Sequence, residues 1–500
     1  MMKSLIAALL LLGGALVASD ALADGGYYAG TLGATATGRG GAVTAKADDL
    51  TAVSYNPAGL AKLDGGIIQL GNTASYNYYS YSRAATLDYG HPDGTTGQPP
   101  LVTFDKVYNR TPWQALDPLI GVASKFGLKD WGFALAAYAP PGISKEEFPQ
   151  GSSNSPSAGG QRYQMISREA MILEYVASLA WKYQDVFGIG ASAQWIYVPR
   201  LNYSLMIDGT VFNQAANPVS SDYDILATMK GSSAFTFNAI LGAFYRPAPF
   251  LEFGVSGQVV PANIVAKSTL DVTPIGSAVG RVSLVRGNQE ANDVTVTMPL
   301  PMVFRAGSRY RHLDGAREVF DIELDVDYVT WSRVNRFTVE TNGLTAVRGA
   351  DKIKLGTINI DKHWKDQVAF RLGGDYAVLP HLLTLRAGAY YESAVSDGAY
   401  DSVDFPTGAQ IGGGVGTSVF LGKLEVVLAY QLRVQPSVFT SEKNARGYQQ
   451  VPGSKCQPPY TDQNNCNANL LNQPSPVVNA GAYSAASQFL ALDLLYHYGL

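Results

Sequence analysis

Within residues 319–328, apolar and acidic side chains alternate strictly from Phe320 onward, and this is the most informative pattern in the chain. Because successive side chains of a β-strand point to opposite faces, the apolar members share one face and the carboxylates share the other. A strand with lipid on one face and a polar lumen on the other accommodates both, which is typical of a transmembrane β-barrel. The apolar face holds Phe320, Ile322, Leu324, Val326 and Tyr328, and the acidic face holds Asp321, Glu323, Asp325 and Asp327.

The same period of two recurs along the chain. Soluble sandwich strands have about five or six residues, whereas a tilted strand needs about ten to cross a bilayer. Several of the alternating runs reach that length, so the sequence predicts an all-β fold, a transmembrane antiparallel β-barrel. These runs cover residues 251–256, 294–305, 370–376, 424–433 and 490–500.

The breaks between the runs fall into two length classes, which predict the topology. Short periplasmic turns alternating with long extracellular loops are typical of outer-membrane barrels, and counting strands between the breaks gives about fourteen, an even number. We therefore expect residues 67–500 to form the barrel. Short breaks lie at 129–130, 184–186, 247–249, 313–317, 379–381 and 422–423. Long polar breaks lie near 83–114, 142–165, 205–230, 271–292, 333–362, 395–408 and 437–485.

Residues 24–66 lack the strand pattern and are rich in glycine and alanine. A barrel of this size leaks unless its interior is filled, so we expect this segment to plug the periplasmic end; a disordered leader is the alternative. Near its end lies the triplet Asn56, Pro57 and Ala58. Proline fixes φ and asparagine bonds to local backbone, so the triplet is expected to brace the plug or to gate it.

The N-terminus carries an export signal. Lys3 precedes the apolar run Leu5–Val17, and Ala21-Leu22-Ala23 supplies a cleavage site. The run is too short to span a bilayer, so residues 1–23 are predicted to be a signal peptide and are excluded from the fold. An exported chain with barrel patterning and no stop-transfer helix is expected in the outer membrane of a Gram-negative cell, as a multi-pass β-barrel in contact with its lipids.

Composition narrows the function classes. The formal net charge of −4 is too small to indicate a nucleic-acid or polyanion partner. Cys456 and Cys466 lie close together in a polar stretch, and in an oxidising compartment we expect a disulfide between them. Metal binding by two cysteines without a nearby histidine is the less favoured alternative. We predict neither a metal site nor a cofactor.

Arginines on the lumenal side are candidates for binding a ligand carboxylate. Two interpretations remain open. Either they form a salt-bridge network that stiffens the wall and pins the plug, or one of them binds an anionic ligand through charge-assisted hydrogen bonds. The candidates are Arg39, which lies between glycines in the plug segment, and Arg305, Arg309, Arg371 and Arg386, which share the side of the acidic face.

A proline pair marks the end of the third predicted strand. Pro140 and Pro141 are followed by Gly142. Two prolines cannot donate to the sheet ladder. The segment is therefore either a simple strand end at a loop or a local opening of the wall.

Several motifs together resemble the FadL/TodX family of outer-membrane transporters. Ala47-Asp48-Asp49 followed by Asn56-Pro57-Ala58 resembles the family's hatch motif. Tyr328-Val329-Thr330-Trp331-Ser332 resembles its strand-end Trp-Ser signature. The segments 371–376 and 384–388 resemble its R-x-G-x-x-Y and L-R-A-G hairpin, and 298–305 resembles its L-P strand. The resemblance covers essentially the whole mature chain.

The resemblance implies a transport route rather than a water-filled pore. It implies that extracellular loops capture an apolar ligand, that a lumenal pocket receives it, and that plug rearrangement opens a lateral exit through the wall. The expected ligand is a long-chain fatty acid or another hydrophobic compound, and the expected state is a monomer.

Two alternatives come from other classes of protein. A polar-solute porin would conduct ions steadily in planar bilayers, whereas a plugged transporter would be nearly silent. An outer-membrane lipase would need a nucleophile motif, and Gly254-Val255-Ser256-Gly257 does not fit G-x-S-x-G. We therefore expect no enzyme activity.

Overall fold

The computed structural model describes residues 30–87, 101–142, 145–151, 159–209, 221–448 and 477–499. The predicted signal peptide, residues 1–23, lies outside these ranges, as do Cys456 and Cys466. Within the described ranges no helix is long and apolar enough to cross a bilayer.

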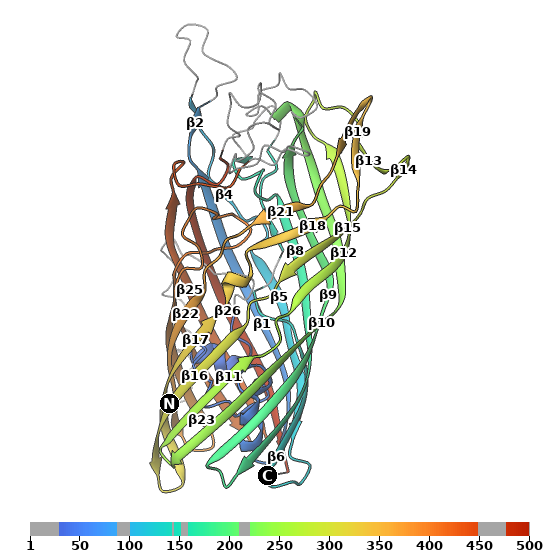
Figure 1. Ribbon diagram of the computed structural model, residues 1–500. Coiled ribbons are helices and arrows are strands. Elements are labelled where there is room, and N and C mark those ends of the chain that lie inside the picture. Colours follow the sequence, from blue (N-terminus) through green and yellow to red (C-terminus); the bar gives the residue numbers. More distant parts are fainter. Residues whose placement is uncertain are drawn as a thin grey trace.

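The wall is a closed antiparallel barrel of fourteen strands, as the sequence predicted (Figure 1). Each strand pairs with the next in chain order, and β1 closes the ring by pairing with β26 over its whole length. The wall strands are β1 (Gly66–Arg83), β5 (Trp113–Ser124), β6 (Trp131–Tyr138), β8 (Ser167–Tyr183), β9 (Phe187–Asp208), β10 (Asp224–Ala248), β11 (Leu251–Gln258), β16 (Val303–Asp314), β17 (Arg317–Val329), β22 (Gln367–Leu379), β23 (Leu383–Glu392), β24 (Gln410–Leu421), β25 (Leu424–Thr440) and β26 (Gly481–Tyr498).

All six short breaks are tight connections between neighbouring wall strands, at the lower end of the barrel in Figure 1. Short turns mark the periplasmic end of such barrels. The two faces of β17 also follow the prediction, because Ile322 and Leu324 are exposed on the outside while Asp321, Glu323 and Asp325 are buried inside. The acidic row of the sequence therefore faces the lumen.

Part of the wall is interrupted above its middle. There the chain of β11, β16, β17 and β22 continues as a four-stranded panel, which stays joined to the wall because its first strand, β12, pairs with β10. The sequence pattern predicted one strand over 294–305, and this is wrong, because pairing stops at Pro299 and resumes at Val303. Pro299 and Pro301 have no N–H to donate, so the ladder cannot continue through them. The panel strands are β12 (Asn263–Pro274), β15 (Asp293–Pro299), β18 (Arg336–Glu340) and β21 (Ile358–Asp361).

The extracellular side carries short elements. A second, four-stranded sheet rises above the panel, with the order β14-β13-β19-β20. Its strands are β13 (Ser283–Arg286), β14 (Gln289–Glu290), β19 (Thr345–Arg348) and β20 (Asp351–Lys354). The other short elements are β2 (Thr86–Leu87), β3 (Leu101–Val102), β4 (Val107–Tyr108), β7 (Glu146–Glu147) and the 3₁₀ turns η4 (Ser221–Tyr223) and η5 (Trp331–Arg333).

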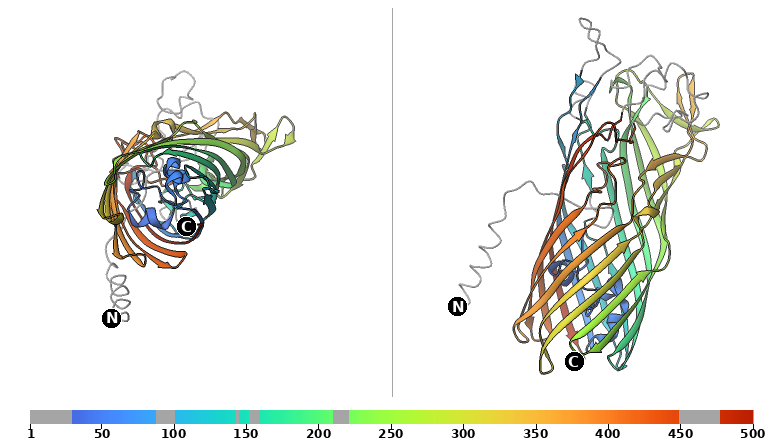
Figure 2. Two further views of the ribbon diagram at one scale, coloured as in Figure 1. Left: turned by 90° about the horizontal axis from the view of Figure 1, so that it is seen from below. Right: turned by 60° about the vertical axis from the view of Figure 1, so that its left-hand side comes forward.

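The segment from residue 30 to residue 65 lies inside the periplasmic half of the ring, as the view from below shows (Figure 2). We call it the plug. It contains α2 (Ala34–Gly38), α3 (Ala52–Tyr55) and the 3₁₀ helix η1 (Pro57–Lys62). Its apolar side joins the main hydrophobic cluster, in which Leu50, Val53 and Leu60 pack among inward-facing residues of the wall, including Leu119, Val176, Val427 and Leu495.

Candidate functional site

The acidic face of β17 binds the backbone of the plug. Asp325 Oδ2 accepts hydrogen bonds from the N–H groups of Val43 at 2.9 Å and Thr44 at 2.8 Å. Glu323 Oε1 accepts from the N–H of Ala45 at 2.6 Å. Buried N–H groups are costly when unpaired, and a carboxylate acceptor makes a stronger bond than a neutral one. The alternating segment of the sequence therefore binds the plug. We call this contact between the lumenal charged residues and the plug the plug seat.

Arg39 is fully buried between the plug and this acidic face. Its guanidinium lies 2.9 Å from Asp321, 3.1 Å from Glu323 and 2.8 Å from Asp375. Burial alone would lower the pKa of Arg39, but the three carboxylates raise it well above its ordinary value. A guanidinium with five donors suits several carboxylates at once. Arg39 therefore ties the plug to two wall strands, β17 and β22.

The other four predicted arginines also lie between the plug and the wall. All of them contact either the plug or a carboxylate of the lumenal network. Arg305 Nη1 donates to Ser54 O at 3.2 Å, Arg309 Nε to Asp321 at 2.6 Å, Arg371 Nε to Asp327 at 2.7 Å and Nη1 to Gly40 O at 3.3 Å, and Arg386 Nε to Asp375 at 3.4 Å. Binding of a ligand carboxylate by any of these arginines stays a prediction.

Glycines on the inner face of the wall let the plug backbone come close. A Cβ atom on Gly388 would lie 2.0 Å from Arg39 O, and one on Gly414 would lie 2.0 Å from Thr37 O. Both distances are far below van der Waals contact, so only glycine fits there. The same holds around the ring for Gly190 against Pro57, Gly242 against Asn56, Gly254 against Thr44 and Gly373 against Arg39.

Asn56 joins two parts of the plug to the wall. Its Nδ2 donates to Thr44 O at 2.9 Å and to Ala243 O of β10 at 3.1 Å, and its Oδ1 accepts from the N–H of Ala58 at 3.3 Å. Asn56 has extended backbone (φ −158°) and caps η1, in which Pro57 takes the first position. The triplet is therefore a hydrogen-bonded turn at the contact of plug and wall.

Replacing Asn56 with alanine should loosen this part of the plug without affecting the wall. Losing hydrogen bonds to two buried carbonyls costs about 1–3 kcal/mol. Hydrogen exchange of residues 44–62 should become faster by the corresponding factor. Asn72→Ala, on the outer wall at β1, removes a bond to Ala115 O and should leave plug exchange unchanged; equal effects of both substitutions would contradict the assignment.

Burial raises the pKa of two further side chains in the plug. Burial raises the pKa of Tyr55 to about 12, and its hydroxyl accepts a hydrogen bond from the N–H of Leu32 at 2.9 Å. Burial also raises the pKa of Asp49, although hydrogen bonds from Thr51 oppose the shift. Both shifts follow from the burial of these side chains in the plug.

The third wall strand leaves the sheet early. β6 pairs with β8 only as far as Tyr138 against Glu174, and pairing on that side of β8 resumes with β7 at Arg168. The chain turns inward instead, since residues 139–142 are buried. Pro141 O accepts a hydrogen bond from the plug at Gly30 N, at 3.0 Å. In the described residues, β8 thus has no partner on this side between Arg168 and Glu174.

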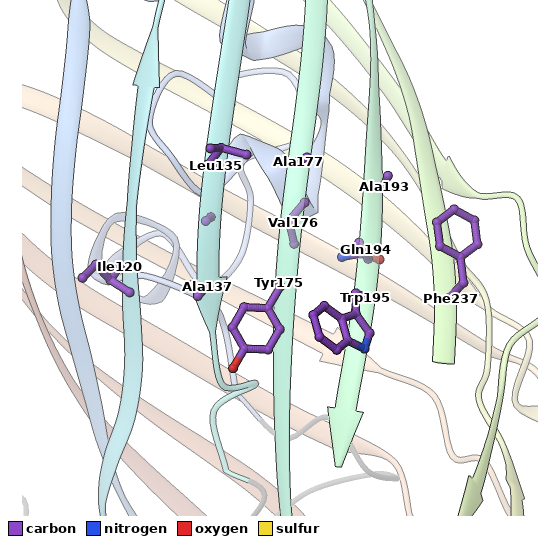
Figure 3. A pocket seen from close by; sticks show the side chains of 11 residues that line it. Ile120, Leu135, Ala137, Tyr175, Val176, Ala177, Ala193, Gln194, Trp195 and Phe237 are labelled. Carbon is purple, nitrogen blue, oxygen red and sulfur yellow. The ribbon is translucent and has the colours of Figure 1, made fainter. Parts of the chain in front are cut away.

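The outer surface beside this interruption is hollowed (Figure 3). The small side chains of Ala137, Ala177 and Ala193 on three neighbouring strands leave this hollow unfilled. Tyr175, Trp195 and Phe237 lie together on one side of it. The hollow measures about 520 Å³ and is almost wholly apolar. Its lining is Ile120, Leu135, Ala136, Ala137, Tyr175, Val176, Ala177, Ala193, Gln194, Trp195 and Phe237.

An enclosed apolar cavity of about 60 Å³ lies in the upper lumen, behind the panel. Two cations stand beside it. Arg168 lies 2.8 Å from Glu146 and stacks 4.4 Å from the centroid of the Phe405 ring. Lys362 forms a buried ion pair with Asp404. The lining includes Ala170, Ile172, Val198, Leu201, Tyr203, Met229, Ile264, Val296, Met298, Phe337, Val339, Ile360 and Phe405.

Sequence reasoning did not single out Arg168 or Lys362. Arg168 is the second residue of a strand, β8, and Lys362 lies in a long break where no period identifies a face. Only their inward orientation and their place beside an apolar cavity distinguish them. A cation within a few residues of a strand end is the one sequence signal that could have included them.

Comparison with known proteins fits this geometry. The crystal structure of a Pseudomonas aeruginosa FadL homologue matches with a TM-score of 0.71 at 15% identity, covering 95% of this chain and 100% of the other. The Pseudomonas putida toluene transporter TodX matches with a TM-score of 0.62 at 13% identity, covering 94% and 99%. The Ralstonia pickettii toluene transporter TbuX matches with a TM-score of 0.55 at 16% identity, covering 94% and 99%.

These likenesses concern the fold, since every identity is low. The search of curated proteins found no match. A family model, however, matches residues 14–470, which is most of the chain. The chain therefore belongs to the outer membrane protein transport protein family (OMPP1/FadL/TodX).

Proposed function

We propose that this protein moves hydrophobic molecules, long-chain fatty acids foremost, across the outer membrane as a monomer. The observation that carries the proposal is the enclosed apolar cavity with Arg168 and Lys362 beside it, above a plug that fills the ring. An apolar cavity binds the acyl chain and a desolvated cation binds the carboxylate. The cavity lies between the extracellular loops and the plug, where a captured ligand has to pass.

The exit is proposed at the third strand. β6 leaves the sheet at Tyr138, and the apolar hollow lies directly outside. Burying an acyl chain gains about 0.8 kcal/mol per CH₂. Overall transfer from water into the bilayer is therefore downhill and needs no energy source. Movement of the plug would also release the contact between Gly30 and Pro141, which links the plug to this segment.

Aromatic hydrocarbons are the second candidate ligands. TodX and TbuX, which share the fold, are toluene transporters. The apolar lining of the cavity suits either ligand class, and the two cations favour the acid. Native mass spectrometry of the purified protein tests this directly, because co-purifying fatty acid supports the proposal and its replacement by hydrocarbon supports the alternative. A steady open conductance in planar bilayers would favour a porin instead.

Lys362 should make the site discriminate between acids and hydrocarbons. Lys362→Met removes one charge-assisted bond, worth about 1.5–3 kcal/mol, from the acid complex alone. Binding of a long-chain acid should weaken by about ten- to a hundredfold, while binding of the matching alkane should not weaken, because Lys362 offers it only the ion pair with Asp404 as an obstacle. Lys365→Met is the control, because Lys365 lies three residues along and forms an exposed pair with Asp397.

Equal losses for acid and alkane in the Lys362 variant would show that Lys362 only supports the fold. The same comparison applies to the five arginines of the plug seat. There we expect no selective loss of the acid.

A further inference from the structure

The loop between β23 and β24, residues 393–409, folds into the lumen, and we call it the inner loop. Val395 and Val403 are fully buried, and Asp404 and Phe405 nearly so. Lumenal side chains bind its backbone. Tyr79 donates its hydroxyl to Ser402 O at 3.1 Å, and Asn479 Nδ2 donates to Ala399 O at 2.9 Å and Asp401 O at 3.0 Å. The inner loop therefore fills space within the upper barrel.

The tip of the inner loop occupies the surroundings of Lys362. Asp404 pairs with Lys362, and the two side chains are only 1% and 2% exposed. Three rings surround the ammonium, with centroids at 5.2 Å for Phe337, 5.9 Å for Trp364 and 5.8 Å for Phe405. Phe405 also lines the apolar cavity. One loop thus supplies both a carboxylate for the cation and an apolar group for the cavity.

Two ion pairs flank the cavity in the absence of a ligand. Arg168 and Lys362 are the cations, and Glu146 and Asp404 are their carboxylates. A third carboxylate buried there would lack a partner, which is strongly unfavourable. An acidic ligand therefore has to replace one of the two acids.

Asp404 is the more loosely held of the two. Glu146 binds Arg168 through both oxygens, at 2.8 Å and 3.2 Å, and sits in a short strand paired with β8. Asp404 binds Lys362 through Oδ2, to which Tyr203 OH donates at 3.5 Å. Its buried Oδ1 makes no hydrogen bond to any described residue. Displacing Asp404 costs fewer interactions than displacing Glu146.

The size of the cavity also indicates that part of its lining has to move before a ligand binds. Sites for drug-sized ligands measure about 300–1,000 Å³, whereas this cavity has about 60 Å³. A long acyl chain does not fit unless something moves out. Among the described lining residues, Phe405 of the inner loop is the one that belongs to neither a wall strand nor a panel strand.

We propose that the inner loop is a built-in occupant of the ligand site. Asp404 holds Lys362 in the empty protein, and a ligand carboxylate takes its place, so that the inner loop withdraws and Phe405 vacates the cavity. Acids open the site by exchange of one carboxylate for another, whereas neutral ligands have to break the ion pair without replacing it. The proposal rests on the proposed function of the cavity and adds the residue that sets its selectivity.

Asp404→Asn tests the proposal with hexadecanoic acid and its methyl ester as the probes. Removing the competing charge should tighten acid binding by roughly tenfold, with a much smaller change for the ester. Asp404→Glu restores the charge and should return the acid-to-ester ratio towards that of the wild type. Asp397→Asn, in the same loop but in an exposed pair with Lys365, should leave the ratio unchanged.

The outcomes separate this proposal from the function it rests on. The measured quantity is the affinity for the acid divided by the affinity for the ester. If the wild type binds the acid and this ratio is unchanged or lower in Asp404→Asn, the role of Asp404 is overturned and the proposed function stands. Failure of the wild type to bind acid or ester removes the function itself. If the variant does not fold, hydrogen exchange of the wild-type inner loop decides, since it should speed up when the acid binds; no change there overturns the proposal.

Discussion

Arg39→Met should release the plug from the barrel wall. The substitution leaves three carboxylates, on Asp321, Glu323 and Asp375, facing a buried apolar side chain. Asp321 and Asp375 stay paired with Arg309 and Arg386, but Glu323 has no other ion-pair partner among the described residues. Breaking a buried ion pair from one side costs about 3–5 kcal/mol, because the remaining charge stays uncompensated. Each 1.4 kcal/mol is about tenfold, so the population of displaced plug should rise by roughly two to four orders of magnitude.

Single-channel conductance in planar bilayers measures this population. The wild type should be nearly silent, and the variant should show frequent openings. Heat-modifiable migration on a gel checks that the barrel itself has formed. Arg317→Met is the control, since Arg317 pairs with Asp314 at an exposed turn and such pairs contribute little. A silent Arg39 variant would show that the plug is held mainly by its apolar contacts.

Gly388→Ala should displace the plug by steric conflict alone. The added methyl group would lie 2.0 Å from Arg39 O and 2.2 Å from Arg39 C, which are backbone atoms and cannot rotate away. Overpacking of a tight interior costs about 1–3 kcal/mol and occasionally more, and we expect the upper end here. The plug should therefore shift away from β23, which weakens the ion pairs between Arg39 and the wall strands.

The matched control for Gly388 is Gly413→Ala on the neighbouring strand β24. A Cβ there meets only Gly388 O, at 3.3 Å, which a small adjustment relieves. Bilayer conductance should rise for Gly388→Ala and stay at the wild-type level for Gly413→Ala. Openings of equal frequency in both variants would attribute the effect to a weaker wall instead of a displaced plug.

The class of fold follows from local patterns along the chain. Alternation over 319–328 can satisfy its two faces only between lipid and a polar lumen, and the lengths of the breaks separate turns from loops. Both signals are local, because they depend on the spacing of neighbouring side chains and on the solvent outside. For this reason the strand count and the inward direction of the acidic face could be predicted from residues alone.

The contacts of the plug seat could be predicted only in part from the sequence. The residue types of Arg39 and the β17 acids indicated a charged network, but the acceptors of plug N–H groups and the glycines at close contacts needed coordinates. Gly388 has no sequence feature that distinguishes it from Gly413. The difference is that one faces the plug backbone and the other does not.

The arrangement of charged groups around the apolar cavity could be seen only in the tertiary structure. Lys362 and Asp404 are 42 residues apart, in two long breaks whose paths no periodicity constrains. The break at Pro299 was missed although Pro299 and Pro301 are visible in the sequence, because apolar alternation continues across them. A period of two records which medium each face meets, whereas the choice of partner for a buried charge depends on which distant loops enter the same lumen.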